Sequence, residues 1–276
     1  DLCFKTDVEV GVDISKTTLE DTFDAIILCT GSQQARDLPL EGRMGFGIHF
    51  AMDYLTEQMQ VLNGEINQPT ITAKNKNVIV IGAGDTGADC VATALRENCK
   101  SVVQFNKYTR LPEKMTVDYN TAWPLAMPVF KMDYAHKEYE ARFGKEPRAY
   151  GVQTMRYDVD HLGYVRGVFT QVLEQTENGM SIVDGTERHW PADLVLLSIG
   201  FVGTENTVPH AFHIATERNK IVADDINYQT NHPHIFAAGD ARRGQSLVVW
   251  AIREGRGVAK AVHHYLTQKN MAQHIK

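Results

Sequence analysis

The stretch VIVIGAGDTGADC, residues 78–90, limits most strongly what this chain can fold into. Four apolar residues lead into a segment that matches the pattern G-x-G-x-x-G, and apolar and small residues then recur at helical intervals. The run SVVQF, residues 101–105, has the composition of a second strand. Residues 77–105 therefore predict a β-α-β unit, in which a right-handed crossover joins two parallel strands.

Each glycine of this turn has a physical role in a dinucleotide site. Gly82 permits a tight turn, Gly84 lets the backbone approach a pyrophosphate, and Gly87 lets the helix pack closely on the strand. Asp85 and Thr86 begin the helix, whose free N–H groups and positive dipole end favour phosphates. The pattern alone is a weak signal, but the strand before it and the helix and strand after it are the required context. We therefore predict dinucleotide binding here, with a purely structural glycine turn as the alternative.

The residues after the second strand bear on which dinucleotide binds. An NAD site usually places Asp or Glu at that point, where the carboxylate binds the ribose 2′-OH. In this chain the strand runs into QFNKYTR, with Lys107 and Arg110 in place of an acid. Because cations suit a 2′-phosphate, we predict NADPH, with NADH possible and a solvated basic turn as the alternative.

A second nucleotide is indicated near the end of the chain. The segment IFAAGDAR, residues 235–242, is a short apolar strand that ends in Gly239-Asp240. In flavoproteins such an Asp can accept a hydrogen bond from a ribityl hydroxyl, whereas in a plain turn it caps the backbone. The segment GQSLVVWAI follows at once. We expect a helix to begin at Ser246, with its positive end towards the pyrimidine end of a flavin.

The remaining segments predict an α/β organisation. The runs FDAIILCTGS and ADLVLLSIGF are buried strands that both exit through glycine, at Gly31 and Gly200. The runs GVQTMRYDVD, YVRGVFTQVLEQ and MSIVDGTERHW alternate as an antiparallel meander does. The breaker NGEINQP suggests a domain boundary near residue 70.

Composition excludes several classes of function. The net charge of −6 gives no electrostatic case for nucleic acid or an anionic membrane. No apolar run approaches the roughly 20 residues that span a bilayer, and no signal peptide is recognised, so we expect a cytoplasmic protein.

The cysteines form no C-x-x-C pair, and the pair His232 and His234 lacks a third ligand, so we predict no metal site. We expect His136 and the other histidines to be structural, and we predict no catalytic acid–base residue.

Four longer segments support a family resemblance. GDTGADC, WPLAMPVFKMDYAHKEYEARFGKEPRAYGV, ADLVLLSIGF and IFAAGDARRGQSLVVWAIREGR together closely resemble the small (beta) subunit of glutamate synthase, or the C-terminal region of fused glutamate synthases. The resemblance implies a Rossmann-like NAD(P)H-binding domain, a parallel sheet plus a β-meander, inserted into part of an FAD-binding domain of the glutathione reductase class. We expect residues 1–69 and 226–276 to form the partial FAD-binding domain and residues 70–225 the NAD(P)H-binding domain.

The resemblance also assigns cofactor-binding residues and partners. It places Gly200 at the far strand end of the NAD(P)H domain, and it assigns to the FAD domain Thr30, Gly31, Gly239, Asp240, Gln245, Ser246 and Leu247. It implies that NADPH reduces FAD and that iron–sulfur centres carry electrons to a large subunit, which forms glutamate from glutamine and 2-oxoglutarate. The family's upstream iron–sulfur region and first FAD glycine turn are absent from this sequence. The resemblance therefore implies FAD binding for the intact protein and leaves it open for this fragment.

Two other functions stay open at this point. One is a related FAD/NADPH electron-transfer subunit with another partner, as in dihydropyrimidine dehydrogenase or the ferredoxin–NADP transhydrogenases. The other is a non-catalytic nucleotide-binding module that docks on a large partner. The strings RRGQSLVVWAI and DYAHKEYEARFGKEPR favour glutamate synthase over the first of these.

Overall fold

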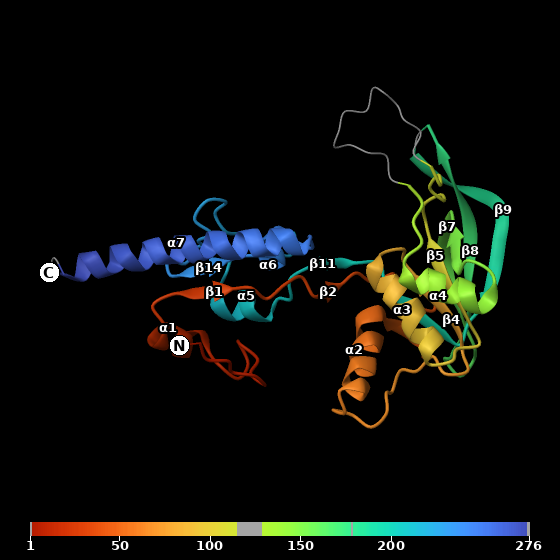
Figure 1. Ribbon diagram of the computed structural model, residues 1–276, viewed down its shortest axis with the longest axis horizontal. Coiled ribbons are helices and arrows are strands. Elements are labelled where there is room, and N and C mark those ends of the chain that lie inside the picture. The colour runs from red at the N-terminus through yellow and green to blue at the C-terminus, as the bar shows by residue number, and fades with distance from the viewer. Residues whose placement is uncertain (1, 115–128, 178, 275–276) are drawn as a thin grey trace. The chain divides into compact units, whose positions relative to one another are not determined.

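In a computed structural model, the chain forms two compact units (Figure 1). The structure describes residues 2–114, 129–177 and 179–274. Unit 1 consists of Asp1–Arg36 and Phe201–Lys276, and unit 2 consists of Asp37–Gly200. Along the chain, unit 2 is thus inserted between the two segments of unit 1.

Unit 2 is built on a five-stranded sheet in the order β3-β10-β4-β5-β6. Its strands are β3 (Ile48–Phe50), β4 (Asn77–Ile81), β5 (Ser101–Asn106), β6 (Arg148–Tyr150) and β10 (Leu194–Leu197). All four pairings are parallel. The central strands β4 and β10 are apolar on both sides, because a parallel sheet is covered on both faces.

Helices cover one face of this sheet (Figure 1). They are α2 (Ala51–Leu62), α3 (Asp85–Arg96) and α4 (Tyr134–Phe143). The alternation of strand side chains sorts residues between the faces. Val78 and Val80 lie in the core with the helices, whereas Ile79 and Ile81 lie in the core on the opposite face.

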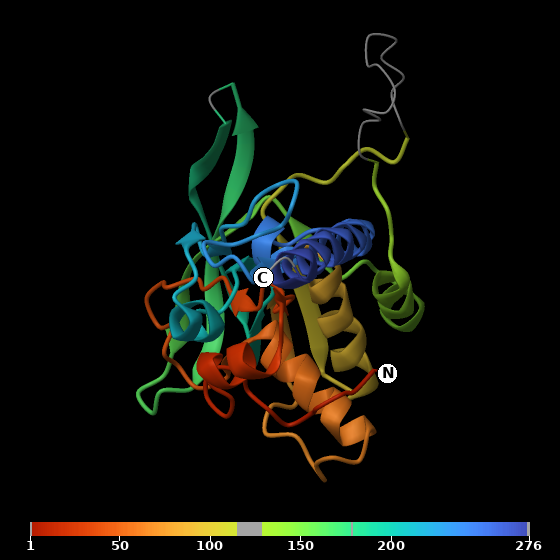
Figure 2. The ribbon, with the colours of Figure 1, turned by 90° about the vertical axis from the view of Figure 1, so that its left-hand side faces the viewer.

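The opposite face is covered by the expected β-meander (Figure 2). Its strands are β7 (Val152–Val159), β8 (Val165–Thr176) and β9 (Gly179–Pro191), paired antiparallel in that order. Phe105 of β5 packs edge-on against Trp190 of β9, with ring centroids 5.1 Å apart. The prediction of a parallel sheet with a β-meander is therefore confirmed.

The described residues of unit 1 form short paired strands and four helices. The parallel pair is β1 (Ile26–Leu28) with β14 (Ile235–Ala237), and the antiparallel pairs are β2 (Gln34–Ala35) with β11 (Phe201–Gly203) and β12 (Thr216–Glu217) with β13 (Lys220–Ile221). The helices are α1 (Lys16–Thr22), α5 (Thr207–Phe212), α6 (Asp240–Arg243) and α7 (Val248–His274). Leu28, Phe212 and Ile235 lie in its main core.

The two units differ in extent from the ranges that the sequence suggests. Residues 37–69 belong to unit 2, because β3 pairs with β10 and the α2 side chain Tyr54 is fully buried in the helix-facing core. Residues 201–225 belong to unit 1, because β11 pairs with β2 and α5 joins the core there. The breaker NGEINQP ends α2 but not the unit, since Glu57 of α2 holds the chain that follows through the backbone N–H of Ile71. The assignment of one cofactor to each unit stays a prediction.

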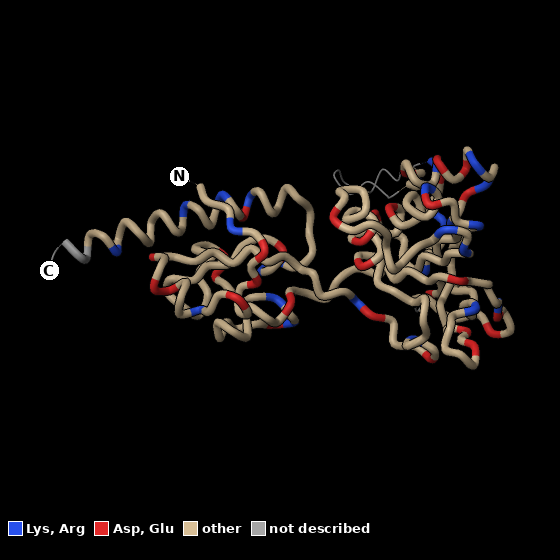
Figure 3. Tube along the Cα trace, turned by 90° about the horizontal axis from the view of Figure 1, so that it is seen from below, with Lys and Arg blue, Asp and Glu red and all other residues tan. Residues whose placement is uncertain are grey.

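Charged residues of both signs are interspersed along the described trace of each unit (Figure 3). This distribution agrees with the modest net charge of −6. Within the residues that the structure describes, no helix combines the length and the apolar character that a membrane span needs.

Candidate functional site

The predicted glycine turn (residues 82–87) lies between β4 and α3, at the carboxyl end of the parallel sheet. Gly82 has a φ of 128°, and a Cβ there would overlap the carbonyl oxygen of Ser198 at the end of the neighbouring strand β10. A Cβ on Gly87 would lie 2.6 Å from Nε2 of Gln104 and 2.7 Å from the carbonyl oxygen of Gly82. The first and third glycines are therefore required by packing inside the unit.

The second glycine, Gly84, stands in a different environment. A Cβ there would meet no atom within 4 Å of it among the described residues, so its backbone faces open space. Gly84 caps α3 without a side-chain hydrogen bond, and the first N–H groups of a helix have no partner within it. Asp85 and Thr86 form the first turn of this 12-residue helix. Open backbone at the positive end of a helix is an arrangement that accepts a pyrophosphate.

Lys107 and Arg110 follow β5 on the same edge of the sheet, and both are exposed. Nζ of Lys107 lies 5.0 Å from the centroid of the Tyr108 ring. Arg110 donates to the carboxylate of Glu113 at 3.1 Å and stacks over Phe130 at 4.2 Å. Arg110 is therefore already held by an acid and a ring, whereas no ion pair of Lys107 is recorded within the described parts of the chain.

An acid that the sequence did not predict lies beside Arg110. Glu146 precedes β6, and its Oε2 lies 4.0 Å from Nε of Arg110. Its Oε1 accepts from Arg148 and, at 2.7 Å, from the hydroxyl of Tyr150. Burial, followed by this hydrogen bond, raises the pKa of Tyr150. No local signal could have revealed Glu146, because β6 comes beside β5 only through the parallel pairing Gln104↔Arg148.

In unit 1 the fold brings two predicted flavin segments together. β1 and β14 are parallel neighbours with Leu28 opposite Ala237, so Thr30-Gly31 and Gly239-Asp240 leave the sheet at the same edge. Gly31 has a φ of 74° and Gly239 a φ of 71°, a region that glycine adopts without strain. A Cβ on Gly239 would meet no described atom within 4 Å of it.

The segment of Gln245, Ser246 and Leu247 also reaches this turn. The hydroxyl of Ser246 donates to Oδ1 of Asp240 at 2.8 Å, and Oε1 of Gln245 accepts from the backbone of Phe201 at 3.4 Å. The expectation that a helix begins at Ser246 is wrong by two residues. The helix α7 begins at Val248, with the carbonyl of Leu247 accepting from its first turn, because Ser246 is engaged by Asp240 instead.

A buried acid supports the Gly239-Asp240 turn, and sequence reasoning missed it. Glu254 of α7 is only 2% exposed. Its Oε2 accepts from the backbone N–H of Gly239 at 2.9 Å, and its Oε1 accepts from Arg243 at 3.0 Å. Within the sequence AIREGR this residue has the pattern of a solvated helix charge, so only the tertiary contact reveals its place.

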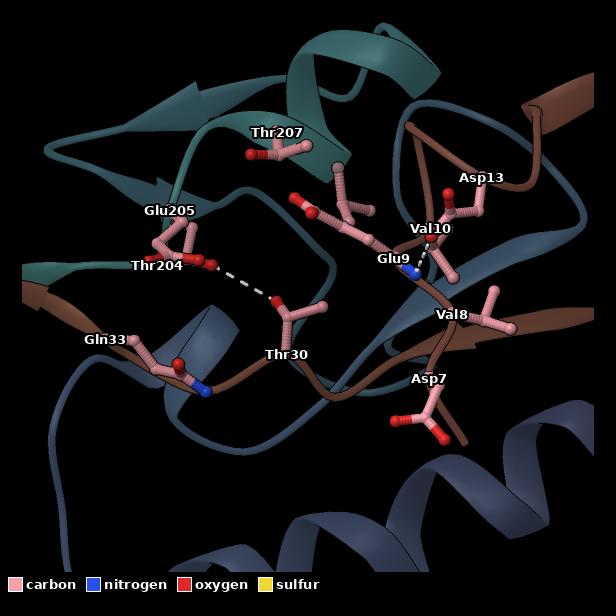
Figure 4. A pocket seen from close by; sticks show the side chains of 11 residues that line it. Asp7, Val8, Glu9, Val10, Asp13, Thr30, Gln33, Thr204, Glu205 and Thr207 are labelled. Atoms are coloured by element: carbon pink, nitrogen blue, oxygen red, sulfur yellow. Dashed lines mark hydrogen bonds between the residues drawn. The ribbon is translucent and has the colours of Figure 1, made fainter. Parts of the chain in front are cut away.

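Thr30 also lines a pocket of about 700 Å³ in unit 1 (Figure 4). Its hydroxyl forms a 3.1 Å hydrogen bond with that of Thr204. Four carboxylates line the same pocket, from Asp7, Glu9, Asp13 and Glu205. Because these negative charges repel a phosphate, the pocket suits an uncharged group, such as a ribose or a base, better than a pyrophosphate.

The remaining predicted residues are placed as follows. Gly200, with a φ of 84°, follows β10 and is the last residue of unit 2. His234 forms a 2.7 Å hydrogen bond with Glu20, and Nε2 of His232 lies 3.2 Å from the carbonyl oxygen of His213. No group of three potential ligands that could hold a metal ion occurs among the described residues. Residues 123–128, part of a family-specific segment, lie outside the described residues.

A glycine turn after a parallel strand in each of two units, one unit inserted into the other, defines a class of nucleotide-binding oxidoreductases. The chain belongs to the pyridine nucleotide-disulphide oxidoreductase family, whose family model matches residues 3–145 and 164–255.

Individual relatives narrow this class. The chain is 49% identical, over 95% of its length, to the glutamate synthase [NADPH] small chain of Bacillus subtilis, and covers 54% of that protein. It is 40% identical, over 93% of its length, to the glutamate synthase [NADH] of Schizosaccharomyces pombe, and covers 13% of that protein. The chain thus spans about half the length of the bacterial relative. The resemblance predicted from the sequence is confirmed.

Solved structures show the same fold. Mycobacterium tuberculosis FprA in complex with NADPH is 15% identical, with a TM-score of 0.68 over 97% of this chain and 69% of that chain. The thioredoxin reductase of T. acidophilum is 20% identical, with a TM-score of 0.56 over 88% of this chain and 66% of that chain. The predicted fold class is therefore confirmed.

Proposed function

We propose that this chain is the NADPH-binding part of a glutamate synthase electron-input subunit, a flavoprotein that passes hydride from NADPH to FAD. The observation that carries the proposal is the similarity to the Bacillus subtilis small chain, which extends over 95% of this chain and therefore through both units. The family to which the chain belongs supports an NAD(P)H-dependent oxidoreductase.

The residues present fit a pyrophosphate at the glycine turn of unit 2. Gly84 has open space where a side chain would stand, and α3 directs its positive end to that space. Lys107 is available for a 2′-phosphate, with Arg110 as a weaker second donor because Glu113 and Glu146 compete for it. We therefore retain NADPH as the preferred reductant and NADH as a poorer one.

The residues of unit 1 fit the ribityl part of a flavin. Gly239 leaves open space in front of its backbone. The hydroxyl of Ser246 donates to Oδ1 of Asp240, so Oδ2 of Asp240 can still accept a hydrogen bond from a ribityl hydroxyl. When bound, the nicotinamide and the flavin supply hydride transfer, and the protein supplies position and electrostatics. Asp240 would orient the ribityl chain, and α7 would present its positive end to the pyrimidine side of the ring.

In the whole protein, the electrons would serve reductive formation of glutamate from glutamine and 2-oxoglutarate on a large subunit. The test is to purify the full chain, record its visible spectrum, and titrate it anaerobically with NADPH and NADH. The expected result is a yellow protein whose flavin absorbance is bleached by NADPH. It should then support glutamate formation when a glutamate synthase large subunit and the iron–sulfur region are added.

Other outcomes would select the alternative functions. A colourless chain that still binds NADPH would indicate a nucleotide-binding module. A flavin that NADPH reduces, without glutamate formation by the completed enzyme, would indicate an electron-transfer subunit for another partner.

A further inference from the structure

The polar side chain of Gln104 lies within the otherwise apolar core on the helix-facing side of the unit 2 sheet. Alternation along β5 places Val102 and Gln104 towards the helices and Phe105 towards the meander. Gln104 is fully buried. Because a buried amide is costly unless its hydrogen-bonding groups are satisfied, its partners explain why it is tolerated there.

The amide of Gln104 lies directly beneath the glycine turn. Its Nε2 donates to the carbonyl oxygen of Gly82 at 2.8 Å. The same Nε2 fills the space that a Cβ on Gly87 would need. In addition, the backbone N–H of Gly82 donates to the carbonyl of Phe105 at 3.1 Å. Strand β5 therefore holds both polar groups of Gly82, one through its backbone and one through the Gln104 side chain.

A buried histidine orients this amide. Nε2 of His136, in the first turn of α4, lies 2.7 Å from Oε1 of Gln104. Nδ1 of His136 accepts from the backbone N–H of Asp133 at 3.4 Å, so Nε2 carries the ring proton and donates to Gln104. With its oxygen occupied by His136, the amide presents its nitrogen to Gly82. The hydrogen bonds thus form a chain from the cap of α4 to the first glycine of the turn.

We propose that Gln104 and His136 are positioning residues for the dinucleotide, acting through Gly82 to set the direction of the free N–H groups at the start of α3. The proposal rests on the proposed function, since it takes residues 82–87 as the NADPH-binding turn. Neither side chain contacts the cofactor in this arrangement. Both act on the backbone that does.

The test compares Gln104→Leu with Tyr54→Phe in the full chain. Tyr54 is a matched control, because it is also fully buried in the helix-facing core and its hydroxyl donates to Glu97 at 2.6 Å, away from the glycine turn. Gln104→Leu loses two hydrogen bonds and Tyr54→Phe loses one, so both variants should lower the thermal unfolding midpoint. Dissociation constants for NADPH and NADH are then measured by nucleotide fluorescence, well below both midpoints.

If the proposal holds, Gln104→Leu raises the dissociation constants of NADPH and NADH by the same factor, about tenfold. Tyr54→Phe should leave both dissociation constants unchanged. Equal weakening separates an effect on the shared pyrophosphate from an effect on the 2′-phosphate. His136→Phe keeps Gln104 but frees its amide to rotate. This variant should raise both dissociation constants by a common factor that is smaller than in Gln104→Leu. This second variant decides the matter if Gln104→Leu does not fold.

Wild-type affinity for both nucleotides in Gln104→Leu, with a midpoint lowered as in Tyr54→Phe, would overturn the proposal and leave the proposed function intact. Failure of the wild-type chain itself to bind either nucleotide would overturn both.

Discussion

Oε2 of Glu254 accepts a 2.9 Å hydrogen bond from the backbone N–H of Gly239, which joins the helix α7 to the turn that precedes α6. Glu254 is 2% exposed and also accepts from Arg243 at 3.0 Å, while an Nη of Arg242 lies 3.5 Å away. A buried carboxylate persists only when it is paired and hydrogen-bonded, and these partners meet that condition. The Gly239-Asp240 turn is therefore anchored from within its own unit.

Removing this carboxylate should destabilise unit 1. Glu254→Ala leaves the guanidinium of Arg243 and the backbone N–H of Gly239 without this acceptor, while Arg242 keeps Asp225 at 2.8 Å. We expect a loss of about 3–5 kcal/mol in the free energy of unfolding. Glu254→Gln keeps an acceptor for Gly239 and should lose less. Urea unfolding measures both. Lys269→Ala is the control, because Lys269 lies on the same helix and forms an exposed ion pair with Asp24. This variant should leave the urea unfolding midpoint unchanged. Equal midpoints for Glu254→Ala and wild type would contradict the anchoring role.

The first two glycines of the turn should respond differently to alanine. Gly82→Ala places a Cβ against the carbonyl oxygen of Ser198 at a φ of 128°, so we expect a loss of about 3 kcal/mol or more in folding stability. Gly84 has a φ of −82° and open space beside it, so Gly84→Ala should fold normally. Its methyl group should nevertheless keep a pyrophosphate from the backbone and weaken NADPH binding. Thermal unfolding and NADPH titration of both variants test this contrast, which normal NADPH affinity in Gly84→Ala would refute.

The cations after β5 should discriminate between the two nicotinamide nucleotides. Replacing Lys107 and Arg110 together by Ala should reduce the binding free energy of NADPH by about 1–3 kcal/mol. The binding of NADH should be nearly unchanged, because only NADPH carries the 2′-phosphate. Lys107→Ala alone should account for most of this loss, since Arg110 is held by Glu113. Calorimetric titration of the single and double variants with both nucleotides provides the measurement. An unchanged NADPH affinity in the double variant would remove both residues from the site.

The buried His136 should make stability depend on pH. Burial, followed by the charge of Arg148, lowers the pKa of His136 below 6.5, against the opposing effect of Asp133 and Glu146. As pH falls below about 6.5, the unfolded chain takes up the proton before the folded protein does, so stability falls until the folded pKa is reached. The slope from one such proton is about 1.4 kcal/mol per pH unit.

The variant His136→Gln should flatten this dependence. Urea unfolding at pH 7 and pH 5.5 should show a smaller difference for His136→Gln than for wild type. His161→Gln is the matched control, since His161 is exposed in the loop between β7 and β8 and its replacement should change neither value. An identical pH dependence in His136→Gln and wild type would show that His136 titrates alike in the folded and unfolded chains.

The glycine turn, the strands on either side of it and the meander could all be predicted from local pattern. Strand alternation, helical spacing and glycine placement are properties of neighbouring residues, and their physics acts over a few positions along the chain. The residues of VIVIGAGDTGADC accordingly form β4, the turn and α3 as expected. The β1 and β14 segments were recognisable for the same reason, each a short apolar run that ends in glycine.

Tertiary structure decided what local pattern could not. Local pattern predicted neither α4 nor β6, because β6 is stabilised by pairing with β5 and α4 by packing against α3. The boundary between the units lies at residue 36 rather than near 69, since β3 gains a partner strand in β10, more than 140 positions later in the sequence.

The supporting residues of the two nucleotide turns were hidden for the same reason. Glu254, Gln104, His136 and Glu146 are polar residues whose sequence neighbours give no sign of a role. Each acquires one only where the fold brings it against a glycine turn, a cation or another buried amide. Local sequence thus specifies where the backbone turns towards a nucleotide, while contacts between distant segments determine how firmly each turn is held, because burial and hydrogen bonding exist only in the packed protein.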